Sequence, residues 1–274
     1  MSIVPIVNTR MYSVAPTAAA DWRTVLSWVL LQADLDWPFV EVPPPAPIAE
    51  LWARGDLGLA MMCGLPYGRR VAAGQAPTLV AAPVPSPPRY QHRPVYMTDF
   101  VVAAVSRHRT LEDTFGGTVG YTLADSLSGG VAPLHHLSRL RTASRDRPLY
   151  AGAVGDLVHA RGVIEAIDDG RIDVGPLDGY AHDLLRKHDP WLAAKVRTVA
   201  TTDPLPIPPL VATAPLTEDQ LARLREALLA AHEAPVLHDA MARLLLERFV
   251  VPGPEDYAPL AALSRADTPA FEDL

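Results

Sequence analysis

The sequence is poor in several residues that carry particular kinds of chemistry. Cysteine occurs once in 274 residues, at Cys63, which excludes an internal disulfide framework and a zinc site built on paired cysteines. Lysine occurs only at Lys187 and Lys195, and the formal net charge is −7. A nucleic-acid interface needs clustered surplus lysine and arginine, so no nucleic-acid partner is expected. No apolar run reaches the roughly 18 residues of a membrane-spanning helix, so we expect no membrane insertion.

A leader is also missing from the sequence as it stands. Residues 1–10 contain no basic segment followed by an apolar stretch and a small-residue cleavage site, which together define a secretory signal peptide. From this we expect a cytoplasmic protein, or a periplasmic or otherwise extracytoplasmic one if a leader has been removed.

The composition is that of a globular protein of one or two domains, with 49% hydrophobic and 20% charged residues. Strand-like apolar runs alternate with helical patterns, which indicates an α/β fold with mostly parallel sheets. Thr217 and Gln220 form a capping box that starts a helix. We expect strands over residues 3–7, 38–42, 57–62, 99–106, 118–122 and 172–177, and further helices over residues 21–33, 48–54, 129–140, 155–167, 180–187 and 236–249.

This pattern occurs twice, and extended or proline-rich segments near residues 95–100 and 200–210 separate the two blocks. We therefore expect two lobes that are joined by two crossing segments. Residues 1–96 and 203–274 form a discontinuous first lobe, and residues 97–202 form the second. Ligands of such α/β folds bind at the carboxyl ends of the strands, so a ligand cleft is expected between the lobes.

Several side chains and glycines follow the predicted strands of the first lobe. Arg10 offers a planar fork for an anion, and Tyr12 offers a ring and a hydroxyl. Gly64 allows the backbone to approach a ligand closely, and Tyr67 lies in the same strand-end loop. Cys63 precedes this loop without the local signature of a catalytic thiol, so we interpret it as a buried inert residue.

The second lobe contains a stronger candidate for anion binding. Ser126, Ser128 and Gly129 open a helix after a predicted strand, where free N–H groups, the positive helix end and the hydroxyls suit an oxyanion. A plain helix cap is the alternative. Asp178 and Tyr180 follow the strand over residues 172–177. Asp178 either caps the next helix or accepts a hydrogen bond from an amine or hydroxyl of the ligand.

Other kinds of site find no support in the sequence. The glycine patterns of phosphate-binding and dinucleotide-binding loops are absent, so no cofactor is expected. His135 and His136 are adjacent and cannot both face one ion from a regular helix, and His182 and His188 are six residues apart rather than four. We therefore expect no metal site and no catalytic residues of a known pattern.

Four segments resemble the phosphate/phosphonate-type solute-binding proteins, which have the type II periplasmic-binding-protein fold. The segments are residues 8–12 before an Ala/Trp-containing helix, residues 50–67, the Ser/Gly loop at residues 126–129, and residues 169–178 with their Gly-x-x-Asp strand. The resemblance covers most of residues 1–215. It implies two α/β lobes that close by a hinge on a small ligand, often an oxyanion. It also implies contacts from Tyr67, Ser126, Ser128 and Gly129, with Asp178 and Tyr180 as weaker transfers.

Two functions from different classes follow. The first is a non-catalytic binding protein for a small phosphonate- or phosphate-like anion, which delivers it to the permease of an ABC transporter. The second is a cytosolic enzyme that uses the same cleft, such as a dehydratase-like or biosynthetic activity, because related proteins without a leader include enzymes. For the second, Asp178, His159 and Tyr12 are the candidate acid/base groups.

Overall fold

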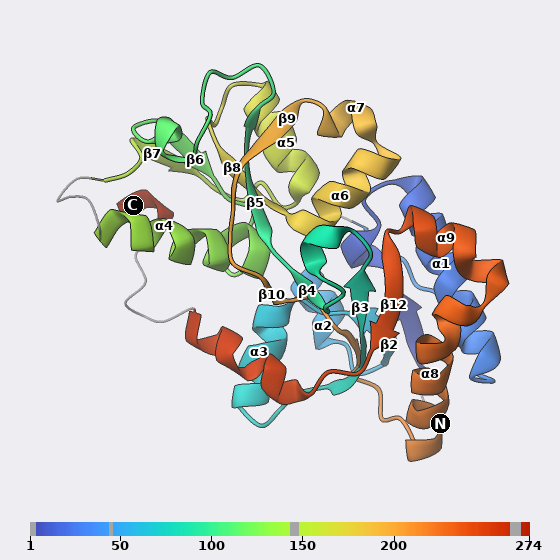
Figure 1. The fold of residues 1–274 in the computed structure, drawn as a ribbon. Helices are drawn as coiled ribbons and strands as arrows, with labels where there is room; N and C mark the ends of the chain where they lie inside the picture. Colours follow the sequence, from blue (N-terminus) through green and yellow to red (C-terminus); the bar gives the residue numbers. More distant parts are fainter. Residues whose placement is uncertain (1–3, 44–45, 143–147, 264–269) are drawn as a thin grey trace. The chain divides into compact units, whose positions relative to one another are not determined.

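The computed structural model describes residues 4–43, 46–142, 148–263 and 270–274, and its chain divides into two compact units (Figure 1). The first unit comprises Met1–Val95 and Pro206–Pro259, and the second comprises Tyr96–Leu205 and Leu260–Leu274. Within the described ranges, none of the helices has the length and apolar character that crossing a bilayer requires.

The first unit is built on a five-stranded sheet. Its strands in spatial order are β1 (Ile6–Asn8), β2 (Leu57–Met61), β11 (Leu210–Ala212), β3 (Thr78–Pro85) and β12 (Leu246–Val250). β1 pairs parallel with β2, whereas β11 lies antiparallel between β2 and β3, and β12 pairs antiparallel with β3. Three strands therefore run in one direction, and the strand that follows the second crossing is inserted against them.

Helices with one apolar face cover this sheet. They are α1 (Pro16–Gln32), α2 (Ile48–Ala53), α3 (Gly64–Ala72), α8 (Glu218–Ala230) and α9 (His238–Arg243). α1 buries Trp22, Val25, Leu26 and Val29 at helical spacing. It packs against α8 and α9, and Asp21 of α1 accepts a bidentate ion pair from Arg243 of α9 (Figure 1).

The second unit has the same plan. β5 (Thr98–Ala103) lies antiparallel between β8 (Gly175–Asp178) and β9 (Val196–Thr201). β6 (Thr118–Gly120) pairs parallel with β7 (Gly152–Val154), and a parallel bridge from Val119 to Val174 links β6 to the residue before β8. Four strands again share a direction, and β5, which follows the first crossing, opposes them. The helices are α4 (Ala132–Thr142), α5 (Ala160–Asp168), α6 (Gly179–His188) and α7 (Pro190–Ala193).

Short elements complete the chain. β4 (Val95–Tyr96) and β10 (Leu205–Pro206) pair where the two crossing segments meet. A wide π turn spans Leu127–Val131 and runs into α4. Single 3-10 turns span Arg10–Tyr12, Pro88–Tyr90, Glu112–Thr114, Ala231–Glu233, Pro235–Leu237, Pro254–Asp256, Ala258–Leu263 and Phe271–Asp273.

The end of the chain lies with the second unit, whereas the sequence analysis placed all of residues 203–274 in the first. The ring of Phe271 stacks on Tyr121 with centroids 4.5 Å apart, and the Leu149 N–H donates to the Leu274 carbonyl. Phe271 and Leu274 are buried in the same apolar cluster as Phe100. Burial of this apolar surface attaches residues 270–274 to the second unit.

Most predicted elements form, but some do not. Residues 38–42 form no strand and contribute only a bridge from Phe39 to Val7. Residues 236–249 do not form one helix, because the chain turns at Leu245 with φ 50° and then enters β12. Residues 83–85 belong to β3, although two of the three are prolines. The helix predicted over residues 155–167 starts only at Ala160, and the loop predicted after β2 is the first turn of α3.

Candidate functional site

The predicted Ser/Gly loop forms the π turn at the carboxyl end of β6. Ser126 caps the turn: its hydroxyl accepts from the Gly129 N–H at 3.2 Å, and its carbonyl accepts from the Val131 N–H at 2.8 Å. Among the described residues, no hydrogen bond occupies the N–H groups of Leu127 and Ser128. Such open donors at a helix start attract anions. The predicted helix thus begins earlier than Gly129, with a wide turn of the kind often found at functional sites.

Asp178 lies against this loop although it is 50 residues away in sequence. One carboxylate oxygen caps α6 by accepting from the Ala181 N–H at 3.0 Å, and the other accepts from the Ser128 hydroxyl at 3.4 Å. The two alternatives for Asp178 are therefore compatible, because its two oxygens face different partners. The Thr98 hydroxyl, at the start of β5, donates to the Ser128 carbonyl at 2.8 Å and so holds the backbone of the loop.

Tyr180 is in the first turn of α6 and is completely buried. Burial, together with the nearby carboxylates of Asp178 and Asp183, raises the pKa of its hydroxyl well above the ordinary value. The hydroxyl therefore stays protonated at neutral pH and can only act as a neutral donor or acceptor.

The candidates of the first unit follow β1 and β2. Arg10 and Tyr12 form a 3-10 turn after β1, and the Arg10 guanidinium donates to the Ala46 carbonyl at 2.6 Å. Arg10 also lines a pocket of about 200 Å³ together with Asn8, Ser13 and Arg23. Partial burial lowers the pKa of Arg10, which nevertheless remains a cation at neutral pH. Tyr12 is buried beneath this turn, with 1% of its surface exposed.

Gly64 and Tyr67 are in the first turns of α3, which begins directly after β2. The Tyr67 N–H donates to the Cys63 carbonyl and thereby closes the first helical turn. The Tyr67 ring meets Tyr257 edge to face at 5.1 Å, and it is fully buried. Its hydroxyl has no hydrogen-bond partner within the described part of the chain. Burial and the charge of Glu255 raise the pKa of Tyr67 to about 12. The hydroxyl therefore stays protonated at neutral pH and keeps its donor unused within the described part of the chain.

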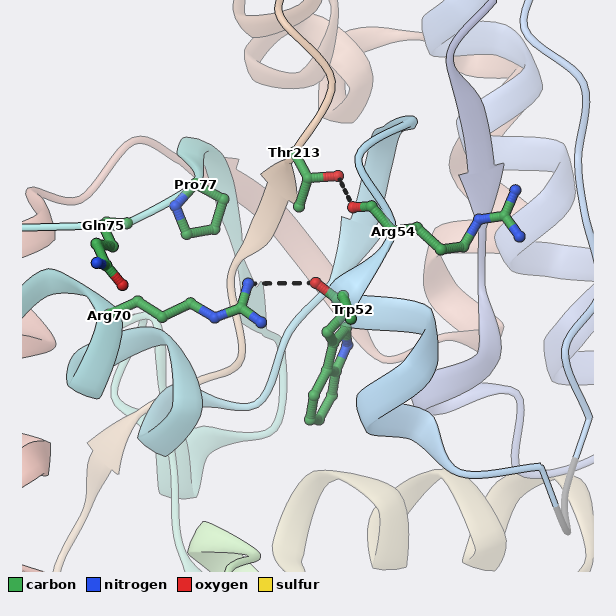
Figure 2. Close-up of a pocket in the computed structure, with 8 residues that line it drawn as sticks. Trp52, Arg54, Arg70, Gln75, Pro77 and Thr213 are labelled. Atoms are coloured by element: carbon green, nitrogen blue, oxygen red, sulfur yellow. Dashed lines mark hydrogen bonds between the residues drawn. The ribbon is translucent and has the colours of Figure 1, made fainter. Parts of the chain in front are cut away.

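A second pocket of the first unit lies at the opposite ends of the strands, near the start of β2 and β3 (Figure 2). It has a volume of about 320 Å³, and it is lined by residues before β2 and β3, by Thr213 just after β11, and by Arg70 of α3. Arg70 donates to the Trp52 carbonyl at 3.2 Å, and Arg54 is held by Asp56 through two hydrogen bonds. Because the predicted residues follow the opposite ends of the strands, this pocket is not the candidate site.

The groups considered for catalysis have structural roles. The His159 Nδ1 accepts from the Gly162 N–H at 3.1 Å and so caps α5. Cys63 is buried and directly precedes α3. Across the described residues, no three histidine, cysteine, aspartate or glutamate side chains come together in a way that could hold a metal ion.

Sequence reasoning missed three residues behind the Ser/Gly loop, namely Thr98, Asp99 and His182. Asp99 and His182 are completely buried, and the His182 Nδ1 lies 2.9 Å from the Asp99 carboxylate. The signal in the sequence was the pair of polar residues at the start of an otherwise apolar strand. Its partner could not be recognised, because the contact joins residues 83 positions apart.

Comparison with known proteins gives one family match. The family described as the periplasmic substrate-binding protein of phosphonate ABC transporters matches residues 18–257. A search of curated proteins by sequence gave no match.

Several solved structures share the fold. A binding protein component of an ABC phosphonate transporter from Pseudomonas aeruginosa has 16% identity and a TM-score of 0.75, over 94% of this chain and 85% of that one. PhnD1 from Prochlorococcus marinus, solved with methylphosphonate, has 15% identity and a TM-score of 0.73, over 95% and 97%. A Xanthomonas citri protein bound to chloride has 20% identity and a TM-score of 0.64, over 95% and 96%. These similarities show a type II periplasmic-binding-protein fold.

Proposed function

The chain belongs to the family of periplasmic substrate-binding proteins of phosphonate ABC transporters, and from this premise we propose that it binds a small phosphonate- or phosphate-like anion at the Ser126–Gly129 loop. The family match supports a ligand-binding protein over the enzyme alternative. The observation that carries the proposed site is the pair of open N–H groups at Leu127 and Ser128, with the Ser128 hydroxyl beside them. Ser126, Gly129 and Tyr67 are proposed as further ligand contacts.

The position of Asp178 restricts the class of ligand. A carboxylate next to an anion site repels a dianion unless the same ligand also presents a positive or hydrogen-donating group. Asp178 already accepts from Ser128 at 3.4 Å, which is a long contact that a better donor can replace. We therefore expect a phosphonate that carries an amine or a hydroxyl to bind more tightly than methylphosphonate.

The partner follows from the family rather than from a contact on this chain. We propose that the protein works outside the cytoplasm and delivers its ligand to the permease of an ABC transporter. Arg10, Tyr12, Gly64 and Tyr180 stay proposed members of the ligand-binding surface. For Arg10 the support is its place beside a pocket after β1.

Isothermal titration calorimetry of the whole chain tests this function. The probes are methylphosphonate, 2-aminoethylphosphonate, inorganic phosphate and methanesulfonate. Ser128→Ala should weaken phosphonate binding by at least about 1 kcal/mol, because it removes a hydrogen bond to a charged group. Ser126→Ala should weaken binding and also lower stability by about 1 kcal/mol, because it removes a helix cap.

Ser138→Ala is the matched control. Its hydroxyl donates to the Leu134 carbonyl within α4, away from the open turn, so the affinity should not change. Unchanged affinity in the Ser126→Ala/Ser128→Ala double variant would remove this loop from the binding site. Consumption of a probe during the titration would favour an enzyme.

A further inference from the structure

β5 begins with two buried polar residues, Thr98 and Asp99, which are exposed by only 1% and 0%. A buried carboxylate costs free energy of folding unless it is fully paired. Asp99 meets this condition. One carboxylate oxygen lies 2.9 Å from the His182 Nδ1, and the other accepts from the Thr201 hydroxyl at 3.0 Å. Because a carboxylate only accepts hydrogen bonds, Nδ1 carries the hydrogen of the first contact.

The two residues hold different parts of the proposed site. Successive side chains of a strand point to opposite faces, so Thr98 and Asp99 face opposite sides of the sheet. Thr98 donates to the Ser128 carbonyl at 2.8 Å and so holds the proposed anion-binding loop over residues 126–129, which is called the anion loop below. Asp99 holds His182, which lies in the first half of α6. One strand thus fixes the loop from one face and the helix from the other.

Asp178 links α6 to the loop over residues 126–129. This residue directly precedes α6, caps its first turn through the Ala181 N–H, and accepts from the Ser128 hydroxyl. Three hydrogen bonds, Ser128–Thr98, Asp99–His182 and Asp178–Ser128, therefore form a closed circuit with the chain itself, which joins Thr98 to Asp99 within β5 and Asp178 to His182 through the first turn of α6. Asp178 and Ser128 are held at a fixed separation although they come from different elements.

We propose that the Asp99–His182 pair is a positioning device that sets Asp178 relative to the anion loop and thereby determines ligand affinity. This inference rests on the proposed function. It does not require either side chain to touch the ligand, which their complete burial argues against.

The second nitrogen of His182 supports a directional role over a purely stabilising one. Nε2 is buried and has no hydrogen-bond partner among the residues that the structure describes. An unsatisfied buried polar atom lowers stability, and a pair of well-packed apolar side chains would avoid this loss. Hydrophobic contacts are non-directional, however, so they would not fix the rotation and register of α6 as a hydrogen bond does.

The test separates stability from position. Asp99→Leu and His182→Leu are made singly and together, and each variant is measured by urea unfolding and by titration with methylphosphonate and 2-aminoethylphosphonate. Each single variant leaves one partner buried without its hydrogen bond, so both stability and affinity should fall. In the double variant, stability should return toward that of the wild type, whereas the dissociation constant should stay about tenfold or more above the wild-type value.

Two further variants sharpen the comparison. Tyr150→Phe removes a buried hydrogen bond to Thr114 (3.0 Å) in the same unit, and it should change the dissociation constant by less than about twofold. Asp99→Asn keeps an oxygen acceptor for one of the two partners and should recover part of the affinity that Asp99→Leu loses.

The possible outcomes separate a failure of the positioning role from a failure of the proposed function. A double variant with wild-type affinity would overturn the positioning role while the proposed function stands. A loss of affinity in Tyr150→Phe equal to that of the double variant would overturn it as well. A wild-type protein that binds none of the phosphonates or inorganic phosphate would overturn both proposals.

Discussion

At the scale of single residues, the buried tyrosines differ in what their hydroxyls contact. Tyr150 bonds to Thr114 at 3.0 Å, and Tyr257 donates to the Ile207 carbonyl at 2.9 Å. Tyr67, which packs against Tyr257, has no such partner within the described ranges. A buried hydroxyl without a partner is a cost in the ligand-free protein, and a ligand that accepts its hydrogen bond would remove that cost.

This difference predicts opposite effects of the same substitution. Tyr67→Phe should leave the free energy of unfolding of the ligand-free protein unchanged or raise it, because a buried unpartnered hydroxyl costs about 1–3 kcal/mol. Tyr150→Phe should lower it by about 1 kcal/mol, because a satisfied hydrogen bond is lost. Urea unfolding measures both. If Tyr67→Phe were the more destabilising of the two, the Tyr67 hydroxyl would have a partner in the folded protein.

Single residues also show how far the sequence could predict the site. Ser126, Ser128, Gly129 and Asp178 are all predicted from their places after strands, and the structure brings Ser128 and Asp178 into contact. The rule that strand ends meet at one edge of a sheet was sufficient for this. Asp99 was read only as part of a strand, because nothing local distinguishes a buried paired aspartate from an exposed one.

At the scale of elements, the π turn over Leu127–Val131 depends on having glycine at positions 129 and 130. A Cβ added to Gly130 would lie 2.3 Å from the Leu123 carbonyl oxygen, and one added to Gly129 would lie 1.8 Å from the Thr122 hydroxyl. The backbone of the π turn therefore packs directly on the segment before it. Gly152, in β7 of the same unit, has no atom within 4 Å of the corresponding point.

Gly130→Ala should therefore lower the free energy of unfolding by more than about 2 kcal/mol, because backbone atoms must move to admit the methyl group. It should also weaken phosphonate binding, because the open N–H groups belong to the same turn. Gly152→Ala should stay within about 0.5 kcal/mol of the wild type. Urea unfolding and calorimetry test the pair. Equal stability of the two variants would contradict the packing described for the turn.

The predicted elements that formed share a strong local signal. The capping box of Thr217 and Gln220 starts α8 as expected, and the apolar run before Cys63 forms β2. The prediction of one helix over residues 236–249 was wrong. Their apolar spacing fits a helix, but the last part of the segment forms β12, which pairs with the free edge of β3. Pairing with a distant strand therefore determined the secondary structure of this segment, and the periodicity of a sequence does not predict such pairing.

At the scale of the whole molecule, each unit is assembled from distant parts of the chain. The first takes β11 and β12 from beyond residue 205, and the second takes residues 260–274. The two crossing segments are predicted from the sequence as extended or proline-rich stretches near residues 95–100 and 200–210. The return of the chain to the second unit could not be predicted from the sequence, because it depends on the burial of Phe271 and Leu274 in a cluster of residues distant in sequence.

Phe271→Ala should consequently destabilise the second unit although Phe271 lies only three residues before Leu274. The loss should be about 3 kcal/mol, because a buried phenylalanine that stacks on Tyr121 is removed. Val105→Ala is the control in the same unit, since Val105 is 97% exposed and should change stability by less than about 0.5 kcal/mol. Thermal unfolding compares them. A Phe271→Ala protein as stable as Val105→Ala would show that residues 270–274 do not contribute to the core.

The insertion of β11 between β2 and β3 also has a consequence for biosynthesis. β2 and β3 are complete once residue 85 has been made, but the strand that joins them begins only at Leu210. At a usual synthesis rate of roughly 5–20 residues per second, the nascent chain waits on the order of ten seconds before the two strand edges that face β11 can pair. Exposed edges of this kind template association with other chains. The first half of the polypeptide is therefore the part that most needs a chaperone while the ribosome is still at work.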